Sequence, residues 1–296
     1  MKNVSVLIDF NNLLFRRFFI KEVAGYSPNP EYQLWKYFVY EDVYNLICKL
    51  KNVKEVVLAV DDRNSWRKSY FNRYKEKRKK NRDKQKDVDW DTLFSEMNKF
   101  VSDLKHHMPF KTIKIPSAEA DDIIGVIAQE SNKNCIVSSN DEDYIQLCSD
   151  KVKLWNPSRK EFIECKDVDK FIIEKCLTGQ SKDDIFNVKT PNDWGLTEAT
   201  KGKRKPGFGP ISAQKVMAGD YIEWLKKNDL EDNFYRNQIL MDFNYIPQTI
   251  RKRIMKIYKN YNFPPPSNIY DYFKKNNMRG FLDNYHNVKN KLLSLY

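Results

Sequence analysis

The sequence predicts an α/β fold with an open, mostly parallel central sheet. Four short apolar runs, each typical of a buried strand, alternate with longer segments whose apolar residues recur at helical spacing. Each of the four runs also ends in acidic residues. Because ligands gather at the carboxyl ends of the strands in such sheets, these acids are expected to meet at one edge.

The four strand candidates span residues 4–8, 56–60, 111–115 and 135–139. The acids that follow them are Asp9, Asp61, Asp62, Glu119, Asp121, Asp122, Asp141, Glu142 and Asp143. One carboxylate at the start of a helix is stabilised by the helix dipole and is ordinary. Three within residues 119–122, next to buried sequence, repel one another unless a divalent cation neutralises them. Oxygen-rich clusters of this kind suit magnesium or manganese.

Composition narrows the class of partner. The chain has 296 residues, 41% of them hydrophobic, with a net charge of +12 and a pI near 9.2. This excess of positive charge indicates a polyanionic partner. Nucleic acid is preferred over a membrane surface because no basic amphipathic anchor is present. The five cysteines are scattered and contain no CxxC pair, so we expect neither a disulfide framework nor a zinc site. With no signal peptide or membrane span in evidence, we expect a reduced, cytoplasmic protein.

The first third of the chain carries most of the positive charge. Residues 10–19 predict a helix whose Arg16 and Arg17 either cover the core with their stems or face a substrate beside Asp9. A loop at 23–30 and a helix at 32–50 follow. From residue 63 to residue 86, twelve Lys or Arg stand against two acids, interleaved with aromatic residues. Such a run is commonly a solvated face, but after the Asp61 cluster it favours a nucleic-acid clamp.

The rest of the chain reads as helices joined by loops. Residues 88–108 predict a core helix ending at a histidine pair that lacks further metal ligands, 152–163 a hairpin, and 168–177 another helix. A basic loop leads into the glycine segment, residues 206–209, which opens a helix. Closely spaced glycines let a phosphate approach backbone amides, although an ordinary helix joint looks the same. The remainder, 221–296, predicts helices, and 290–296 is a candidate docking peptide.

Taken together, these residues resemble the structure-specific 5′ nucleases, the family of flap endonucleases and 5′-3′ exonucleases, and within it the branch of the T-even phage ribonucleases H. The resemblance spans nearly the whole chain. Its motifs are Leu7-Ile-Asp9 with Arg16; Leu58-Ala-Val-Asp61; Trp66-Arg67-Lys68 with Tyr74-Lys75 and Arg78; Glu119-Ala-Asp121-Asp122; Ser138-Ser139 with Asp141-Glu-Asp143 and Gln146-Leu147; and Gly207-Phe-Gly209.

The resemblance implies a role for each matching residue. Two or more divalent ions, Mg²⁺ with Mn²⁺ as a substitute, would bind Asp9, Asp61, Glu119, Asp121, Asp122, Asp141, Asp143 and Asp183. Lys75 and Arg78 would act on the scissile phosphate from a basic helical arch. DNA would be held by Arg16, Arg67, Lys68, Tyr74, Lys203, Lys205, Gly207, Gly209 and Lys215, with K⁺ at the glycine segment.

The family also implies an architecture and partners. We expect a PIN-like nuclease domain over residues 1–184, including an arch at 63–90, and a helical DNA-binding domain over 185–296 with a helix-hairpin-helix near 203–217. The substrates would be DNA with 5′ flaps, nicks or RNA primers, cut during phage lagging-strand replication in the bacterial host cytoplasm. A single-strand-binding protein and a sliding clamp would be partners of a monomeric enzyme without membrane association.

Three departures from the family pattern keep alternatives open. Gln180 stands where a carboxylate is usual, Asn140 is an extra residue before Asp141, and the loop 185–205 is long. A weak or inactive relative that only binds branched DNA is therefore an alternative. A PIN-fold ribonuclease is disfavoured by the glycine segment and the arch. A phosphatase with an Asp9 nucleophile is disfavoured because Asn11 replaces the second aspartate of such enzymes.

Overall fold

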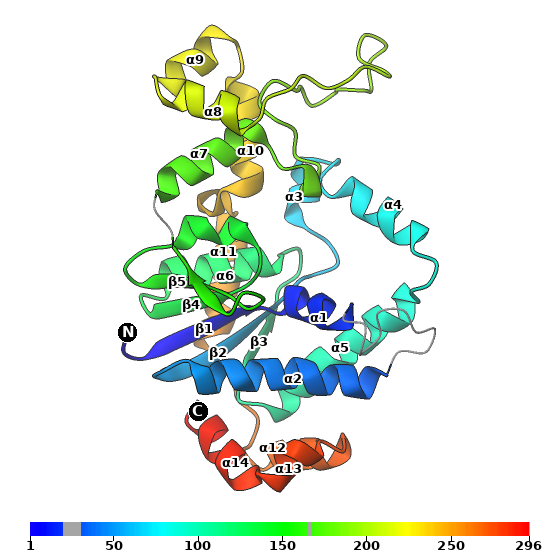
Figure 1. The fold of residues 1–296 in the computed structure, drawn as a ribbon, viewed down its shortest axis with the longest axis vertical. Helices are drawn as coiled ribbons and strands as arrows, with labels where there is room; N and C mark the ends of the chain where they lie inside the picture. Colours follow the sequence, from blue (N-terminus) through cyan, green and yellow to red (C-terminus); the bar gives the residue numbers. More distant parts are fainter. Residues whose placement is uncertain (20–30, 165–166, 296) are drawn as a thin grey trace. The chain divides into compact units, whose positions relative to one another are not determined.

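The computed structural model describes residues 1–19, 31–164 and 167–295, so the loop predicted at 23–30 lies outside the described residues. A six-stranded sheet of order β3-β2-β1-β4-β5-β6 forms its centre (Figure 1). The strands are β1 (Val4–Asp9), β2 (Val53–Val60), β3 (Lys111–Lys114), β4 (Asn134–Ser138), β5 (Val152–Asn156) and β6 (Glu161–Ile163). All neighbours pair in parallel except β5 and β6, which form an antiparallel hairpin. The predicted α/β fold, its four strands and its hairpin are confirmed.

One face of the sheet is covered by a large apolar core. Val4, Val6 and Ile8 alternate along β1 and pack in one cluster with the helices on this side. These helices are α1 (Phe10–Phe18), α2 (Tyr32–Lys49), α5 (Trp90–His107), α12 (Asn268–Lys275), α13 (Arg279–Asp283) and α14 (Tyr285–Leu293). Leu292 and Leu295, within the candidate docking peptide at 290–296, are buried in this core, while Asn290 and Ser294 are exposed.

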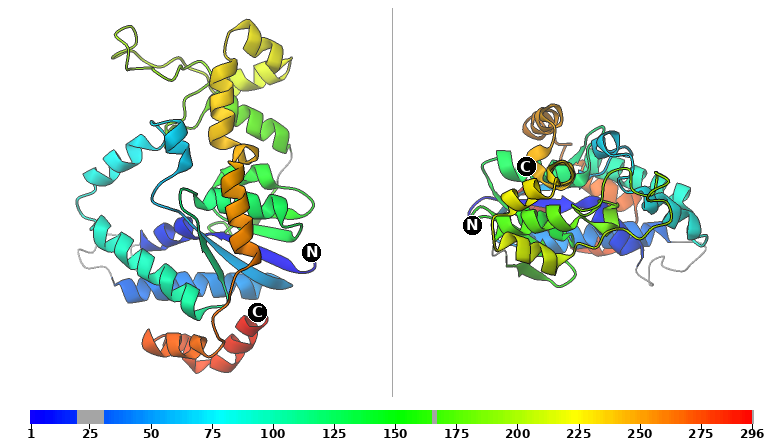
Figure 2. Two further views of the ribbon diagram at one scale, coloured as in Figure 1. Left: turned by 180° about the vertical axis from the view of Figure 1, so that it is seen from behind. Right: turned by 90° about the horizontal axis from the view of Figure 1, so that it is seen from above.

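The other face is covered by α6 (Ala120–Glu130) and α11 (Gln248–Lys259), and α11 lies across the sheet in the rear view (Figure 2). A buried polar network holds α11 in place. Glu55 on β2 accepts hydrogen bonds from the Ser5 hydroxyl at 2.8 Å and the Tyr258 hydroxyl at 2.5 Å, and it pairs with Lys111 at 2.8 Å. Because a buried carboxylate needs such partners, this network fixes the helix to the sheet.

The chain forms two compact units. Unit 1 comprises Met1–Asn64, Gln85–Glu164 and Thr249–Tyr296, and unit 2 comprises Ser65–Lys84 and Cys165–Gln248. The sheet and the last three helices therefore belong to unit 1, while most of the basic segment belongs to unit 2. This division differs from a single boundary after residue 184, because the chain returns to the sheet after unit 2.

Unit 2 is mainly helical. Its elements are α3 (Trp66–Tyr70), α4 (Glu76–Lys84), α7 (Val168–Thr178), η2 (Ser181–Asp183), α8 (Pro210–Met217), α9 (Tyr221–Lys227), α10 (Glu231–Met241) and η3 (Phe243–Tyr245). The buried Arg236 donates to the carbonyl oxygens of Phe186 and Thr190, each at 3.0 Å, and so organises the loop after η2. Gly179 ends α7 with φ +69°, and a side chain there would collide with the Phe186 backbone.

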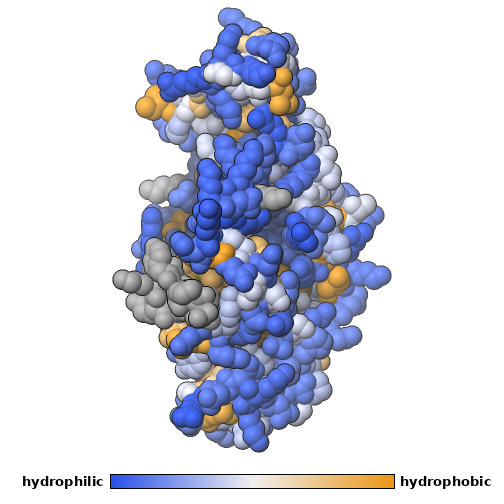
Figure 3. All heavy atoms as spheres, turned by 90° about the vertical axis from the view of Figure 1, so that its right-hand side faces the viewer, coloured by the Kyte–Doolittle hydropathy of each residue, from blue (hydrophilic) through white to orange (hydrophobic). Residues whose placement is uncertain are grey.

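No helix in the described ranges has the length and apolarity that crossing a membrane requires. The face in Figure 3 is predominantly hydrophilic, as the charged composition predicts.

Cys48, Cys135 and Cys176 are free thiols. Cys148 is disulfide-bonded, so the expectation of a chain without disulfides is wrong at this residue.

Candidate active site

The carboxyl ends of β1, β2 and β4 bring the predicted acids of unit 1 to one edge of the sheet. Asp9 is the last residue of β1 and pairs in register with Ala59 of β2, while Ile8 pairs with Ser138 of β4. Asp61 directly follows β2, and Asp141 follows β4 by three residues. Because these strands pair in parallel, the acids that follow them lie together at one edge of the sheet, as the sequence predicts.

Tyr144 joins two of these acids. It lies on η1 (Glu142–Leu147), and its hydroxyl is 2.6 Å from Asp121 Oδ1 and 3.4 Å from Asp9 Oδ2. Burial, together with the charges of Asp121 and Asp9, raises the pKa of Tyr144 well above its usual value. The phenol therefore stays protonated and acts as a hydrogen-bond donor between a strand end and a helix start.

Short polar contacts hold the remaining acids in place. The Ser139 hydroxyl donates to Asp9 Oδ2 at 3.1 Å and accepts the Asp141 N–H at 3.1 Å. Asp61 Oδ1 accepts the Ala120 N–H at 2.7 Å, which ties the end of β2 to the start of α6. These contacts make the edge a connected network from β1, β2, β4 and α6.

Asp9 has an unusual electrostatic environment. Burial and the neighbouring charge of Asp61 raise the pKa of Asp9 from 3.8 to about 7, with a further contribution from Asp141, against the lowering effect of hydrogen bonds from Asn12 and Ser139. A carboxylate whose pKa is raised by burial and by a neighbouring charge is a frequent sign of a functional site. A cation among them would favour their charged forms.

The other acids predicted as metal ligands in unit 1 lie at or near the starts of helices. Asp122 is fully buried and accepts the Glu119 N–H at 2.9 Å, so it caps α6. Glu119 is also buried, directly before α6. The Asp143 N–H donates to Asp141 Oδ1 at 3.0 Å. The cap uses only Oδ2 of Asp122, so it leaves the predicted metal role of Asp122 untested, and Asp9, Asp61, Asp121 and Asp141 lie within the network.

The donor set suits a hard divalent cation. Every side chain in the network offers oxygen, which magnesium and manganese prefer, and burial, with the charge of Asp61, raises the pKa of Asp9 and so disfavours its charged form. Within the described ranges, no three Asp, Glu, His or Cys side chains already form a ready ligand group. Mg²⁺ commonly binds through one or two carboxylates and keeps several waters. We conclude that the residues fit a divalent metal by their chemistry.

The remaining predicted metal ligand, Asp183, belongs to unit 2. Within that unit its carboxylate is paired with Arg78, and its backbone oxygen accepts the Lys75 N–H at 2.9 Å. The next residue, Asp184, accepts the Lys77 N–H at 2.8 Å and pairs with the Lys77 ammonium at 2.8 Å. Both aspartates thus anchor the start of α4, the basic helix expected to form the arch.

The side chains predicted to contact DNA differ in their exposure to solvent. Arg67 is only 2% exposed and donates to the Leu240 carbonyl at 2.8 Å, and Tyr74 is buried in the core of unit 2. The expectation that these two side chains contact DNA is therefore not supported, because Arg67 is buried against the Leu240 carbonyl and Tyr74 is packed in an apolar core. Lys68, Lys203, Lys205 and Lys215 are exposed.

The glycine segment leads into α8, but no helix directly precedes it. Residues 201–209 have no regular structure, and the previous helix is α7. A side chain added at Gly207 or Gly209 would meet nothing within 4 Å. Packing within the described chain therefore does not require glycine at either position. This leaves the close approach of an outside backbone as a physical reason for them.

Two family models match the chain. A model for the 5′-3′ exonuclease N-terminal resolvase-like domain matches residues 4–175, and a model for the C-terminal part of T4 RNase H matches 166–287. The ribonuclease H of Enterobacteria phage T4 is 32% identical over 238 residues, which cover 77% of this chain and 77% of the relative. A 5′-3′ exonuclease of Buchnera aphidicola (subsp. Schizaphis graminum) is 24% identical over 200 residues, covering 63% and 66%.

Solved structures support the fold. The T5 D15 protein co-crystallized with metal ions superposes with a TM-score of 0.61 at 18% identity, covering 88% of this chain and 100% of the other. The bacteriophage T5 D15 flap endonuclease in a complex with DNA and metal ions gives a TM-score of 0.59 at 18% identity, with the same coverage.

The fold and the sequence matches together define a 5′ nuclease architecture. The chain belongs to the 5′-3′ exonuclease family and is a phosphodiesterase of the 5′ nuclease class. Within that family, its C-terminal part is of the T4 ribonuclease H type. This confirms the family that the motifs indicated.

The sequence did not indicate the roles of two polar residues, Tyr144 and Asp42. Tyr144 looks like an ordinary core aromatic, since nothing in its spacing reveals that it joins Asp9 to Asp121. Asp42 lies inside a helical pattern, and only the fold shows that it pairs with Arg16 and Arg17. Asp42 stands beside Glu41 on a helix that also carries lysines, so its position in the sequence gave no distinct signal.

Proposed function

We propose that this protein is a divalent-metal-dependent 5′-3′ exonuclease and flap endonuclease. It hydrolyses phosphodiester bonds at the 5′ ends of RNA or DNA on duplex or branched DNA, and it removes primers and flaps in phage lagging-strand replication. The observation that carries the proposal is the acid network at the carboxyl edge of β1, β2 and β4, in a chain of the 5′-3′ exonuclease family. Mg²⁺ is the proposed ion, with Mn²⁺ as a substitute and K⁺ at the glycine segment.

The residues of the network have separable roles in this proposal. Asp9, Asp61, Asp121 and Asp141 would hold the ion, which when bound supplies Lewis-acid stabilisation and a lower pKa for attacking water. Tyr144 and Ser139 orient the carboxylates through the hydrogen bonds already formed. Lys75 and Arg78 bring positive charge to the phosphate, and Asp183 pairs with Arg78.

The proposed partners follow from the family. Substrates are DNA with 5′ flaps, nicks or RNA primers, bound through exposed cations such as Lys68, Lys203, Lys205 and Lys215. A single-strand-binding protein and a sliding clamp complete the set, and the enzyme acts as a monomer. The T5 D15 flap endonuclease, which shares the fold, has been crystallised with DNA and metal ions.

A 5′-labelled flap duplex tests the proposal. With magnesium, the wild-type protein should release the flap, and Asp121→Asn should lower the cleavage rate by about 100-fold or more while leaving DNA affinity nearly unchanged. Glu142→Gln, an exposed acid on the same edge, is the matched control and should cleave normally. No cleavage by wild type with magnesium or manganese would instead support a protein that only binds branched DNA, the alternative suggested by Gln180.

A further inference from the structure

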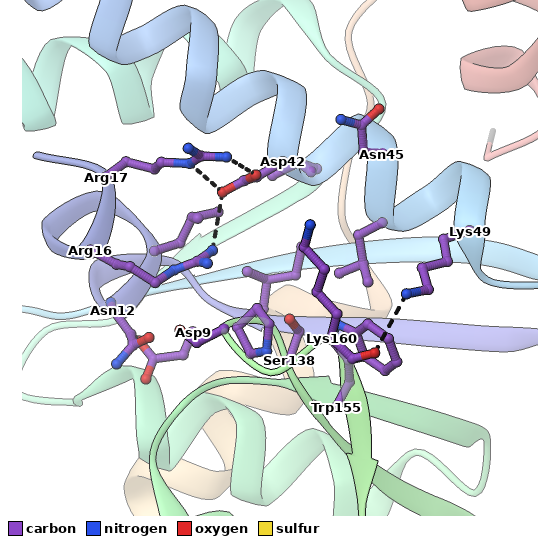
Figure 4. A pocket seen from close by; sticks show the side chains of 16 residues that line it. Asp9, Asn12, Arg16, Arg17, Asp42, Asn45, Lys49, Ser138, Trp155 and Lys160 are labelled. Atoms are coloured by element: carbon purple, nitrogen blue, oxygen red, sulfur yellow. Dashed lines mark hydrogen bonds and ion pairs between the residues drawn. The ribbon is translucent and has the colours of Figure 1, made fainter. Parts of the chain in front are cut away.

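A pocket of about 700 Å³ opens beside Asp9 in unit 1 (Figure 4). Its walls come from the end of β1, from α1 and α2, and from the β5–β6 hairpin. The volume falls within the range of about 300–1,000 Å³ that small-molecule sites occupy. The pocket is therefore large enough for a ligand well beyond a single ion.

One wall holds a guanidinium with unused hydrogen-bonding capacity. Arg17 uses its Nε and Nη2 on Asp42, and Arg16 donates Nη2 to Asp42 Oδ2 at 3.1 Å (Figure 4). The Nε of Arg16 is buried and has no hydrogen-bond partner. A buried charged donor without an acceptor is costly, so the site is short of one acceptor.

The opposite wall adds more positive charge. The Lys49 ammonium lies 4.4 Å from the centroid of the Trp155 ring and 3.5 Å from the Lys160 carbonyl oxygen. Lys160 itself lines the pocket. Four cationic side chains therefore face two carboxylates, Asp9 and Asp42, and Asp42 is already paired with both arginines. The pocket thus favours an anion.

The remaining walls are suited to more than a bare phosphate. Leu13, Leu46 and Trp155 supply apolar surface, and Asn12 and Asn45 supply amides that can donate or accept. Apolar walls with a few polar groups are typical of sites for organic ligands. A nucleoside fits this mixture, and the cationic side chains that line the pocket suit a phosphate monoester.

We propose that this pocket binds a 5′-phosphorylated nucleotide, namely the terminal nucleotide of the strand that is cut or the mononucleotide released from it. The inference rests on the proposed nuclease function, since Asp9 forms part of both the acid network and the pocket wall. Arg16, Lys49 and Lys160 bind the phosphate, and the apolar wall carries the nucleoside. The pocket therefore makes the enzyme prefer 5′-phosphate over 5′-hydroxyl ends.

Ligand binding to the full chain tests the pocket directly, independently of cleavage. Calorimetry without divalent ions would compare 5′-dAMP, 3′-dAMP, deoxyadenosine and inorganic phosphate. We expect 5′-dAMP to bind about tenfold or more tightly than deoxyadenosine, and Lys49→Ala with Lys160→Ala to remove that advantage. The matched control, Lys51→Ala with Lys153→Ala, changes two exposed lysines that do not line the pocket.

Cleavage of nicked duplexes with 5′-phosphate or 5′-hydroxyl ends gives a second readout. The rate ratio should favour the phosphate end in wild type and in the control, and should approach one in the Lys49→Ala, Lys160→Ala variant. Equal binding of inorganic phosphate and 5′-dAMP, or of 5′-dAMP and deoxyadenosine, overturns the inference. A wild type that cuts flaps but shows no such preference refutes the pocket alone, whereas absence of all cutting refutes the nuclease proposal.

Discussion

At the scale of single residues, the site depends on how negative charge is held together. Asp9 is buried at a strand end, with Asp61 and Asp141 contributing repulsion and Ser139 and Tyr144 contributing hydrogen bonds. The carboxylates remain close because backbone pairing fixes their positions, at a cost that a bound cation would relieve. Removing single groups should therefore separate stability from chemistry.

Replacing Asp9 should change how stability depends on pH. Its folded pKa of about 7 lies above the ordinary 3.8, so between these values the folded state binds more protons than the unfolded state. Without divalent ions, this residue therefore makes the protein less stable as the pH rises through that window, by about 1.4 kcal/mol for each unit of pKa difference. Asp9→Asn should remove this contribution.

Urea unfolding with a chelator, from about pH 4 to about pH 7, measures the effect. Asp150→Asn, an exposed acid after η1, serves as the control and should keep the wild-type slope. An Asp9→Asn profile that parallels the wild type would show that the environment of Asp9 does not penalise its charge.

Tyr144→Phe should weaken catalysis while keeping the fold. The substitution preserves the ring and removes the hydroxyl that donates to Asp121 at 2.6 Å. Since groups that orient metal ligands are commonly worth about 10- to 100-fold, we expect a loss of that size in cleavage rate or in magnesium affinity. Magnesium titration of flap cleavage gives both quantities. Tyr270→Phe, at an exposed tyrosine, is the control, and an unchanged titration would exclude an orienting role.

At the scale of elements, α4 depends on two aspartates outside it. It carries one of the densest basic runs of the chain, and such a helix would repel itself without compensation. Asp183 and Asp184 receive its first backbone and side-chain donors. The short η2 segment therefore acts as an anchor for the predicted arch.

Asp184→Asn should loosen the start of α4. The residue has φ +58°, which asparagine tolerates, so the change removes charge without straining the backbone. Burial opposes ionisation, but the side chain and N–H of Lys77 hold the pKa of Asp184 below its usual value, which shows that the charged form is favoured. We expect amide exchange at residues 77–80 to accelerate about tenfold, because a hydrogen bond to a charged group contributes more than one to a neutral group.

Hydrogen exchange followed by mass spectrometry measures this change. Asp83→Asn, an exposed acid within α4, is the matched control and should leave exchange near residue 77 unchanged. Equal exchange in Asp184→Asn and wild type would mean that other contacts hold the helix.

At the scale of the whole molecule, charge is concentrated in sequence. The window from residue 63 to residue 86 holds twelve Lys or Arg and two acids, which is +10 of the net +12. Most of this window lies in unit 2, together with the glycine segment. DNA affinity should therefore depend mainly on cations of unit 2.

Salt dependence of DNA binding tests this distribution. Lys68→Ala and Lys203→Ala should each reduce the slope of log affinity against log salt by about 1, if each cation neutralises one phosphate. Lys274→Ala, on α12 of unit 1, is the control and should leave the slope unchanged. Slopes that respond only to Lys274→Ala would place the DNA contacts elsewhere.

The sequence by itself determined the strands, their terminal acids, the hairpin and the basic segment, because each has a local signature in apolar period, turn residues or charge. Tertiary structure decided what depends on contacts between distant segments. It joined Asp9 to Asp121 through Tyr144, buried Arg67 and Tyr74, paired Asp42 with both Arg16 and Arg17, and packed the last helices of the chain against α2 and α5. A residue's type records what it can bind, but burial and partners select among those uses, and both arise only when the chain folds.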